Sequence, residues 1–109
     1  MPNYFVYIVT NPAKTVLYTG MTNDLERRII EHFRNRGNNK TFAGRYYCYN
    51  LVCYERFHSS SHAIEREKEI KDWNRSKKET LISEFNPSWG ALNGSIMQWP
   101  PPPEVMSNY

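Results

Sequence analysis

The chain carries two tyrosines, an arginine, a histidine and a glutamate whose order suggests phosphate chemistry. Tyr7 and Tyr18 lie in two short apolar stretches, and Arg28 and His32 follow in a helix-like segment. Glu67 comes later, in a second helix-like segment. Two phenols, a guanidinium and an imidazole could hold a water molecule and a phosphate diester, and a carboxylate could hold a metal ion. These five residues are therefore the candidate catalytic set.

Two strand-like stretches must position the tyrosines. Residues 4–10 and 16–19 are rich in β-branched and aromatic side chains, and residues 11–14 (Asn-Pro-Ala-Lys) have the composition of a turn. This pattern predicts a β-hairpin, with Gly20 ending its second strand. Side chains alternate between the two faces of a strand, so the two tyrosines share a face only in the right register, which the sequence leaves open.

The arginine and the histidine belong to a helix predicted over residues 24–34, with Thr22 or Asn23 as its cap. Its apolar arc, which must face the core, is formed by Leu25, Ile29, Ile30 and Phe33. Arg28 and His32 are four residues apart on one flank of this arc, whereas Arg27, Glu31 and Arg34 point away from it. Either residue could alternatively fill a boundary position without a catalytic role.

Glu67 lies in a second helix, predicted over residues 62–74. The apolar arc of this helix is formed by Ala63, Ile64, Ile70 and Trp73. Glu67 projects from within the arc, while the other carboxylates, Glu65, Glu69 and Asp72, point away. A carboxylate among core-facing residues needs a cation or hydrogen-bond donors, so a divalent metal is favoured over an ion pair with Arg28. Asn74, on the same arc, could support the site or cap the helix.

The rest of the chain predicts a mobile loop over residues 36–44, a strand over 46–57 and a third helix over 77–85. Beyond them the periodicity is lost, and the proline run 100–103 predicts an extended tail with polyproline II character. We therefore divide the chain into a domain over residues 4–89 and a proline-rich tail over 90–109.

Composition limits the class of protein. A chain of 109 residues suits one domain, and a net charge of +3 permits an anionic partner without requiring one. Cys48 and Cys53 without a secretory signal predict a reducing, cytoplasmic location, and no apolar run suggests a membrane span. With His58 and His62 the cysteines could suggest zinc, but the gap of four residues after Cys53 is too short for a zinc finger, which favours buried thiols.

Two groups of basic residues could hold a nucleic-acid backbone. The first surrounds the predicted loop and consists of Arg34, Arg36, Lys40 and Arg45. The second lies on the second and third helices and consists of Lys71, Arg75, Lys77 and Lys78. Such cations would contact phosphates rather than read a base sequence. Each of them could also be an ordinary solvated surface residue.

The ordered motifs resemble the GIY-YIG nuclease superfamily, in particular its small stand-alone bacterial members with a domain like the amino-terminal nuclease of excinuclease C. The first motif stands here as Phe-Val-Tyr at 5–7 and the second as Tyr-Thr-Gly at 18–20. The resemblance extends over about residues 4–89 and includes residues 21–28, His32, residues 63–67 and Asn86. The chain departs from the family at Phe5 and Thr19, where the motifs have Gly and usually Ile, but neither change removes a reacting group.

The resemblance implies a small α/β (α+β) domain with a central three-stranded antiparallel sheet flanked by helices. It also implies one divalent ion, Mg²⁺ or Mn²⁺, and endonucleolytic cleavage of DNA, with a repair or recombination role by analogy. The motif tyrosines fall on Tyr7 and Tyr18, the catalytic arginine on Arg28 and the metal-binding glutamate on Glu67, and His32 would hold the phosphate or a tyrosine hydroxyl. Asn86 and Asn74 would support the site.

Two other readings remain open. The chain could be a non-catalytic nucleic-acid-binding module of the same fold, or one that needs a partner for activity. Alternatively, the proline run could dock into an aromatic groove of a partner protein.

Overall fold

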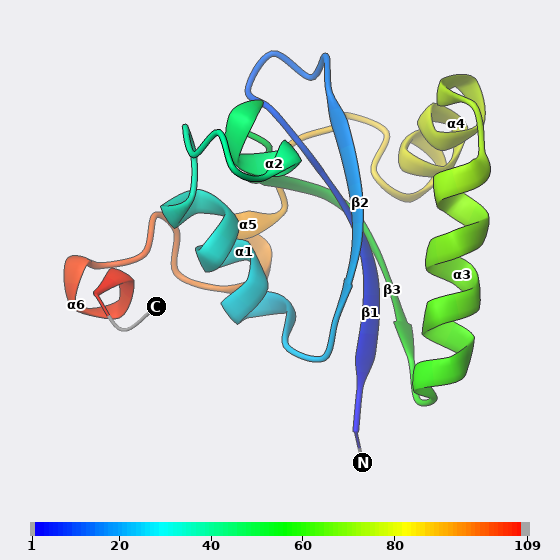
Figure 1. Cartoon of the computed structure of the whole chain (residues 1–109), viewed down its shortest axis with the longest axis horizontal. Coiled ribbons are helices and arrows are strands. Elements are labelled where there is room, and N and C mark those ends of the chain that lie inside the picture. The colour runs from blue at the N-terminus through cyan, green and yellow to red at the C-terminus, as the bar shows by residue number, and fades with distance from the viewer. Residues whose placement is uncertain (1, 108–109) are drawn as a thin grey trace.

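A central sheet organises the molecule. The computed structural model describes residues 2–107. Its sheet consists of β1 (Tyr4–Thr10), β2 (Leu17–Thr22) and β3 (Asn50–Phe57), which pair antiparallel in the order β2-β1-β3. Helices lie on both sides of this sheet (Figure 1). The three-stranded antiparallel sheet and the α+β class are therefore confirmed.

The register of the hairpin answers the question that the sequence left open. Tyr7 pairs with Gly20, and Val9 pairs with Tyr18. Because Tyr7 and Val9 are two residues apart, they point to the same face, and so does the partner of each. Both tyrosines therefore face the same side of the sheet. Gly20 does not end β2, which continues to Thr22.

The first helix covers that face. α1 spans Leu25–Arg34, and its cap is Asp24 rather than Thr22 or Asn23, because the Asp24 side chain accepts a hydrogen bond from the Arg27 N–H at 3.1 Å. The predicted apolar arc faces inward. Leu25, Ile29 and Ile30 are buried and Phe33 is half-buried.

A short helix occupies part of the segment that was predicted to be a loop. α2 spans Phe42–Arg45, and the Thr41 hydroxyl caps it by accepting from the Gly44 N–H at 3.0 Å. Ala43 is buried, and its carbonyl accepts from the Cys48 N–H at 2.9 Å. Ala43 also packs in an apolar cluster with Tyr7, Val9 and Leu51 of the sheet, which holds α2 against it. The third strand begins later than predicted, at Asn50 rather than at residue 46.

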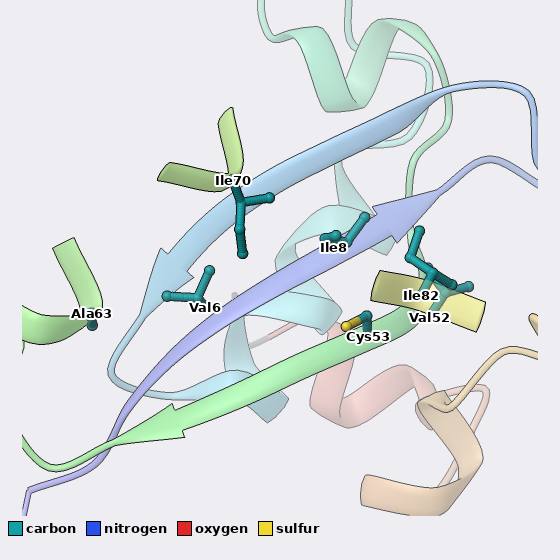
Figure 2. Close-up of a cluster of buried hydrophobic side chains, with 7 residues drawn as sticks. All are labelled: Val6, Ile8, Val52, Cys53, Ala63, Ile70 and Ile82. Carbon is teal, nitrogen blue, oxygen red and sulfur yellow. The ribbon is translucent and has the colours of Figure 1, made fainter. Parts of the chain in front are cut away.

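Two helices cover the opposite face of the sheet (Figure 1). α3 spans Ser60–Asp72 and α4 spans Arg75–Phe85. Figure 2 shows the apolar cluster that they bury with the sheet, formed by Val6, Ile8, Val52, Cys53, Ala63, Ile70 and Ile82. The break between the helices comes earlier than predicted because Trp73 has extended backbone angles.

The carboxyl-terminal segment was expected to be extended but contains two single-turn helices, although Pro102 does have the backbone angles of polyproline II. α5 spans Asn93–Ile96 and α6 spans Pro103–Met106. The buried Asn93 side chain accepts from the Leu51 N–H at 2.8 Å and donates to the Tyr49 carbonyl at 2.9 Å, which fastens α5 to β3. Residues 108–109 of the predicted tail lie outside the described residues. A domain boundary at residue 89 stays a prediction.

Within residues 2–107, no helix has the length and apolar character needed to cross a membrane. Cys48 and Cys53 are buried thiols that form no disulfide.

Candidate active site

The Tyr7 hydroxyl is the centre of the candidate site. It accepts a hydrogen bond from Arg28 Nε at 3.0 Å and lies 2.8 Å from His32 Nε2. Tyr7 projects from the central strand and is 1% exposed, while Arg28 and His32 lie one turn apart on α1. The helical spacing recognised in the sequence therefore places both side chains over the same phenol.

Gly20 provides the space that this arrangement needs. A Cβ atom at Gly20 would lie 2.6 Å from Tyr7 Cζ and closer still to the hydroxyl oxygen. Because Tyr7 and Gly20 are paired across β1 and β2, the phenol lies over the glycine backbone. Sequence reasoning had assigned Gly20 to the end of a strand and missed this steric role. The available signal was a glycine in a strand-like stretch, because such a glycine often marks the close approach of another group.

Burial sets the protonation of the cluster. Burial and, to a smaller extent, the positive charge of Arg28 together lower the pKa of His32 to about 3, so the imidazole is neutral near pH 7. Burial raises the pKa of Tyr7, against the opposing effect of Arg28. Since Arg28 Nε can only donate, the Tyr7 hydroxyl accepts from it and donates its own proton to His32 Nε2. Neutral His32 then carries its proton on Nδ1.

Tyr18 has a different environment. Its ring is half-buried and makes an edge contact with His32, with centroids 5.5 Å apart. Among the described residues, none forms a hydrogen bond with its hydroxyl. Tyr18 lines a cavity of about 110 Å³ whose other walls are Arg28, His32, Asn35, Thr41, Phe42 and Ala43. This cavity therefore contains both the Tyr18 phenol and the Arg28 guanidinium in its walls.

Glu67 reaches the site from the other side of the sheet. Its negative charge contributes to the raised pKa of Tyr7, after the effects of burial, Arg28 and Tyr18, so the carboxylate lies within electrostatic range of the phenol. Its side chain is 22% exposed, and Oε2 lies 3.3 Å from Lys71 Nζ. The alternative pairing with Arg28 is not formed, because the carboxylate partner of Arg28 is Glu31 at 3.2 Å.

The apolar arc predicted around Glu67 needs one correction. Ala63 and Ile70 are buried and Trp73 packs against the same cluster, but Ile64 is 39% exposed. α3 contacts the sheet along a narrow strip, so a position one step from Ala63 already faces solvent. Glu67 therefore lies at the edge of the buried strip rather than inside it.

The residues present suit a metal ion held by one protein carboxylate. No group of three or more His, Cys, Asp or Glu side chains suited to a metal occurs in residues 2–107, so a closed protein cage is not formed there. Mg²⁺ keeps several water ligands and is commonly held by one or two carboxylates together with substrate phosphates. Glu67, which is partly exposed and within electrostatic range of Tyr7, fits that arrangement.

The two asparagines expected to support the site have structural contacts. The Asn74 side chain is exposed and caps α4 by accepting from the Lys77 N–H at 2.9 Å. Buried Asn86 donates to the carbonyls of Val52 and Gly90, at 3.2 and 2.8 Å, and so ties the end of α4 to β3. Neither side chain forms a hydrogen bond with a candidate catalytic residue. A supporting role at the site stays a prediction.

The cations of the first group are exposed and lie between the end of α1 and the end of α2. This group consists of Arg34, Arg36, Lys40 and Arg45. Two of them are held by neighbours. The Arg36 guanidinium stacks over the Phe33 ring at 3.8 Å, and Arg45 Nη2 donates to the Asn39 carbonyl at 3.3 Å.

The cations of the second group have more varied surroundings. Lys71 pairs with Glu67, and the Lys77 ammonium lies 4.6 Å from the centroid of the Trp73 ring. Arg75 and Lys78 line a cavity of about 240 Å³ together with Thr15, Val16, Leu17 and Phe42. Phe42 also lines the cavity beside Tyr18, so it lies between these cations and the candidate catalytic residues.

Phe42 was missed from sequence because it fell within the predicted loop. Two signals in the sequence could have identified it: a capping threonine directly before it, and two further aromatic residues within the next five positions.

Comparisons with known proteins identify the family of this chain. The family model described as the GIY-YIG catalytic domain matches residues 3–80, which include all five candidate catalytic residues. A UPF0213 protein of Natronomonas pharaonis is 43% identical over 82 residues, which are 75% of this chain and 93% of that protein. A UPF0213 protein of Staphylococcus saprophyticus is 42% identical over 84 residues, or 77% of this chain and 99% of that protein.

The fold is shared with a solved structure. The solution NMR structure of a UPF0213 protein from Bacillus halodurans matches with a TM-score of 0.51 and 34% identity. The match covers 88% of this chain and 97% of that one, so it extends beyond the catalytic domain model into the carboxyl-terminal segment.

Proposed function

Because this chain belongs to the GIY-YIG catalytic domain family, we propose that it is a metal-dependent endonuclease that hydrolyses phosphodiester bonds in DNA. The observation that carries the proposal is the convergence on one phenol. The Tyr7 hydroxyl bonds to both Arg28 and His32, within electrostatic range of Tyr18 and Glu67. A satisfied buried network of this kind holds its members in fixed positions, as catalysis of phosphoryl transfer requires.

Arg28 is proposed to bind the scissile phosphate. Its Nε is occupied by Tyr7 and its Nη1 by Glu31, which leaves Nη2 without a partner in the described part of the chain. Since Arg28 lines the cavity beside Tyr18, that nitrogen can donate to a phosphate oxygen there. A guanidinium held in advance stabilises the extra negative charge of the transition state without reorganising.

The two tyrosines are proposed to have different roles. Tyr7 stays protonated because burial raises its pKa, and its hydrogen bonds are committed to Arg28 and His32. Tyr7 is therefore a positioning residue that orients the guanidinium, while neutral His32 accepts a hydrogen bond from the Tyr7 hydroxyl. Tyr18 has the uncommitted hydroxyl, and it lines the cavity. We assign to Tyr18 the contact with the attacking water.

The metal ion would be held by Glu67. Once bound, Mg²⁺ or Mn²⁺ would supply Lewis-acid stabilisation of the phosphate and of the departing oxygen. Lys71 is the present partner of the Glu67 carboxylate and would have to give up that contact. A partly exposed ion pair of this type contributes only about 0–1 kcal/mol, so its loss is a small cost.

The remaining assignments are extensions of the same proposal. The two basic groups would contact the DNA backbone, with a preference for nicked, flapped or branched DNA over intact duplex. The activity would serve repair or recombination in the cytoplasm, where the buried thiols of Cys48 and Cys53 would stay reduced.

The test is a cleavage assay on labelled linear, nicked, flapped and four-way DNA with Mg²⁺, Mn²⁺ or EDTA. Wild type is compared with Glu67→Gln, and the matched control is Glu65→Gln, an exposed carboxylate on the same helix. We expect metal-dependent cutting that falls at least about a hundredfold in Glu67→Gln and is unchanged in the control.

Two results would contradict the proposal. Cutting that persists in EDTA or in Glu67→Gln would remove the metal assignment. DNA binding without cutting under any of these conditions would favour the non-catalytic module.

A further inference from the structure

An exposed aromatic pair lies beside the candidate catalytic residues. Phe42 is 52% exposed and Tyr46 is 42% exposed, and their ring centroids are 4.9 Å apart. On its other side Phe42 stacks on Tyr18, with centroids 6.3 Å apart and planes inclined by 27°. We call Phe42 and Tyr46 the aromatic step. Together with Tyr18, the aromatic step forms a row of three rings that leads from the candidate site to the surface.

Within the aromatic step, Phe42 lines two cavities of different character. The cavity of about 110 Å³ contains Tyr18 and Arg28, where the scissile phosphate is proposed to lie. The cavity of about 240 Å³ lies at the β1–β2 turn, on the other side of Phe42, and is lined by Arg75 and Lys78. Both α2 and the start of α4 lie at this end of the sheet (Figure 1). A strand that occupied both cavities would pass over the Phe42 ring.

The second cavity has the charge of a phosphate site. No acidic residue lines it. Arg75 is fixed at its rim, because Nη1 donates to the Thr15 carbonyl at 2.6 Å and Nε to Glu79 at 3.0 Å. Lys78 forms no ion pair with any residue between 2 and 107, so its ammonium is available to neutralise a phosphate.

The order of these groups follows the order of groups in a single strand of nucleic acid. A strand presents phosphate, base and phosphate in turn, and the surface presents Arg28, the aromatic step and Lys78. We propose that the aromatic step stacks an unpaired DNA base next to the scissile phosphate while Lys78 holds the neighbouring phosphate. This site would select DNA with a single-stranded segment at the cleavage point. The inference deepens the proposed function and rests on it for the position of the scissile phosphate.

Duplex DNA fits the aromatic step less well. Base faces inside a duplex are covered by their neighbours, whereas an unpaired base exposes a face to an aromatic ring. Stacking of this kind tolerates any base sequence, because every base has such a face. The site would therefore read the shape of the substrate and not its sequence.

Binding measured in EDTA tests the inference without cleavage. The probes are a fluorescein-labelled single strand and a duplex of the same sequence, and the variants are Phe42→Leu and Phe42→Trp. We expect Phe42→Leu to weaken single-strand binding about tenfold with little change for duplex, and Phe42→Trp to retain it. The matched control is Phe85→Ala, at a phenylalanine that is 47% exposed on α4 and lines neither cavity.

A fluorescent base analogue placed at the junction of a flap gives a second readout. Its emission should be quenched on binding to wild type and less quenched on binding to Phe42→Leu. Lys78→Gln should lower the slope of log affinity against log salt by about one, since one phosphate contact is lost. Thermal unfolding of each variant confirms that it is folded.

Two results would overturn the inference. One is unchanged single-strand affinity in Phe42→Leu, and the other is an equal loss for single strand and duplex. The outcome is separable from that of the proposed function. If wild type never cleaves but Phe42→Leu loses single-strand binding selectively, the nuclease assignment fails while the base-stacking surface stands.

Discussion

Neighbouring residues of β1 face two surfaces that differ in chemistry. Val6 and Ile8 point into the cluster under α3 and α4, where the labelled side chains are apolar or carry only a thiol (Figure 2). Tyr7, between them, points to the other side and forms hydrogen bonds with α1. One strand thus separates a surface that is stabilised by burial from a surface that holds the polar network of Tyr7, Arg28 and His32, while the proposed metal ligand Glu67 comes from α3.

The difference explains how a small domain can hold a polar network without becoming unstable. Burial of apolar groups is non-directional, so the α3 and α4 side can supply stability without exact geometry. The α1 side depends on geometry, because a buried polar atom without a partner is costly. Within residues 2–107, no buried side-chain nitrogen or oxygen lacks a partner. We therefore expect substitutions on the two sides to have different consequences.

The largest expected effect is on stability, from truncation on the apolar side. Ile70→Ala should lower the free energy of unfolding by about 2–5 kcal/mol, because Ile70 is 1% exposed and its removal leaves a cavity. The matched control is Ile64→Ala on the same helix, which should change stability by less than about 0.5 kcal/mol. Urea denaturation measures both. Equal losses would mean that α3 packs differently from the structure.

The next largest effect is a loss of cleavage activity, from a substitution in the polar network on the α1 side of the sheet. Arg28→Lys should reduce cleavage about a hundredfold to a thousandfold, because lysine cannot both donate to Tyr7 and present a fixed fork to phosphate. Arg27→Lys is the matched control, at an adjacent arginine whose side chain is 61% exposed. Single-turnover cleavage rates measure both variants. Comparable losses would show that the helical face does not select the arginine.

A smaller effect is expected from filling the space that Gly20 of β2 leaves for the Tyr7 phenol of β1. Gly20→Ala should displace the Tyr7 phenol from Arg28 and His32, because the added methyl group would overlap it. We expect a loss of about 1–3 kcal/mol in stability, as for other overpacked sites, together with a loss of cleavage. Gly94→Ala, where nothing lies within 4 Å of the added atom, is the control. Full activity in Gly20→Ala would contradict the observed Tyr7 position.

The smallest expected effect is the change in the free energy of unfolding with pH. Burial lowers the pKa of His32 to about 3 from an ordinary value of 6.5, so the unfolded chain binds a proton at His32 that the folded protein does not. The contribution of neutral His32 to the stability of the folded protein is present in full above about pH 6.5 and is lost as the pH falls toward 3. The slope is at most about 1.4 kcal/mol per pH unit.

Urea denaturation of wild type and His32→Gln between pH 7.5 and 5 measures this effect. Wild type should lose stability more steeply than His32→Gln as the pH falls. The matched control is His58→Gln, at an exposed position. Parallel pH profiles for wild type and His32→Gln would contradict the buried neutral imidazole.

Part of the fold and of the site was predictable from local patterns. The hairpin followed from its composition and turn residues, and α1 followed from its apolar spacing. The same spacing selected Arg28 and His32, because residues four apart share one side of a helix. These predictions succeeded because the interactions they rely on join residues close in sequence.

The sequence-based predictions failed where tertiary packing determines the local structure. The helical pattern placed Ile64 in the core, but α3 touches the sheet along a narrower strip than the pattern suggests. The segment around Phe42 looked like a loop because its helix is one turn long and depends on a cap and on the contact between Ala43 and Cys48. The segment after α4 looked extended, but it forms α5, and Asn93 fastens that helix to β3.

By itself, the sequence determined which side chains share a face of each strand and helix, and therefore which groups were available for catalysis. Only the tertiary structure decided the register that puts Tyr7 over Gly20 and the 2.8 Å contact between Tyr7 and His32, which are 25 positions apart. It also decided that Phe42 lies between Arg28 and Lys78. The physical reason is that side-chain periodicity is a local property, whereas contacts between distant segments depend on the packing of the whole chain.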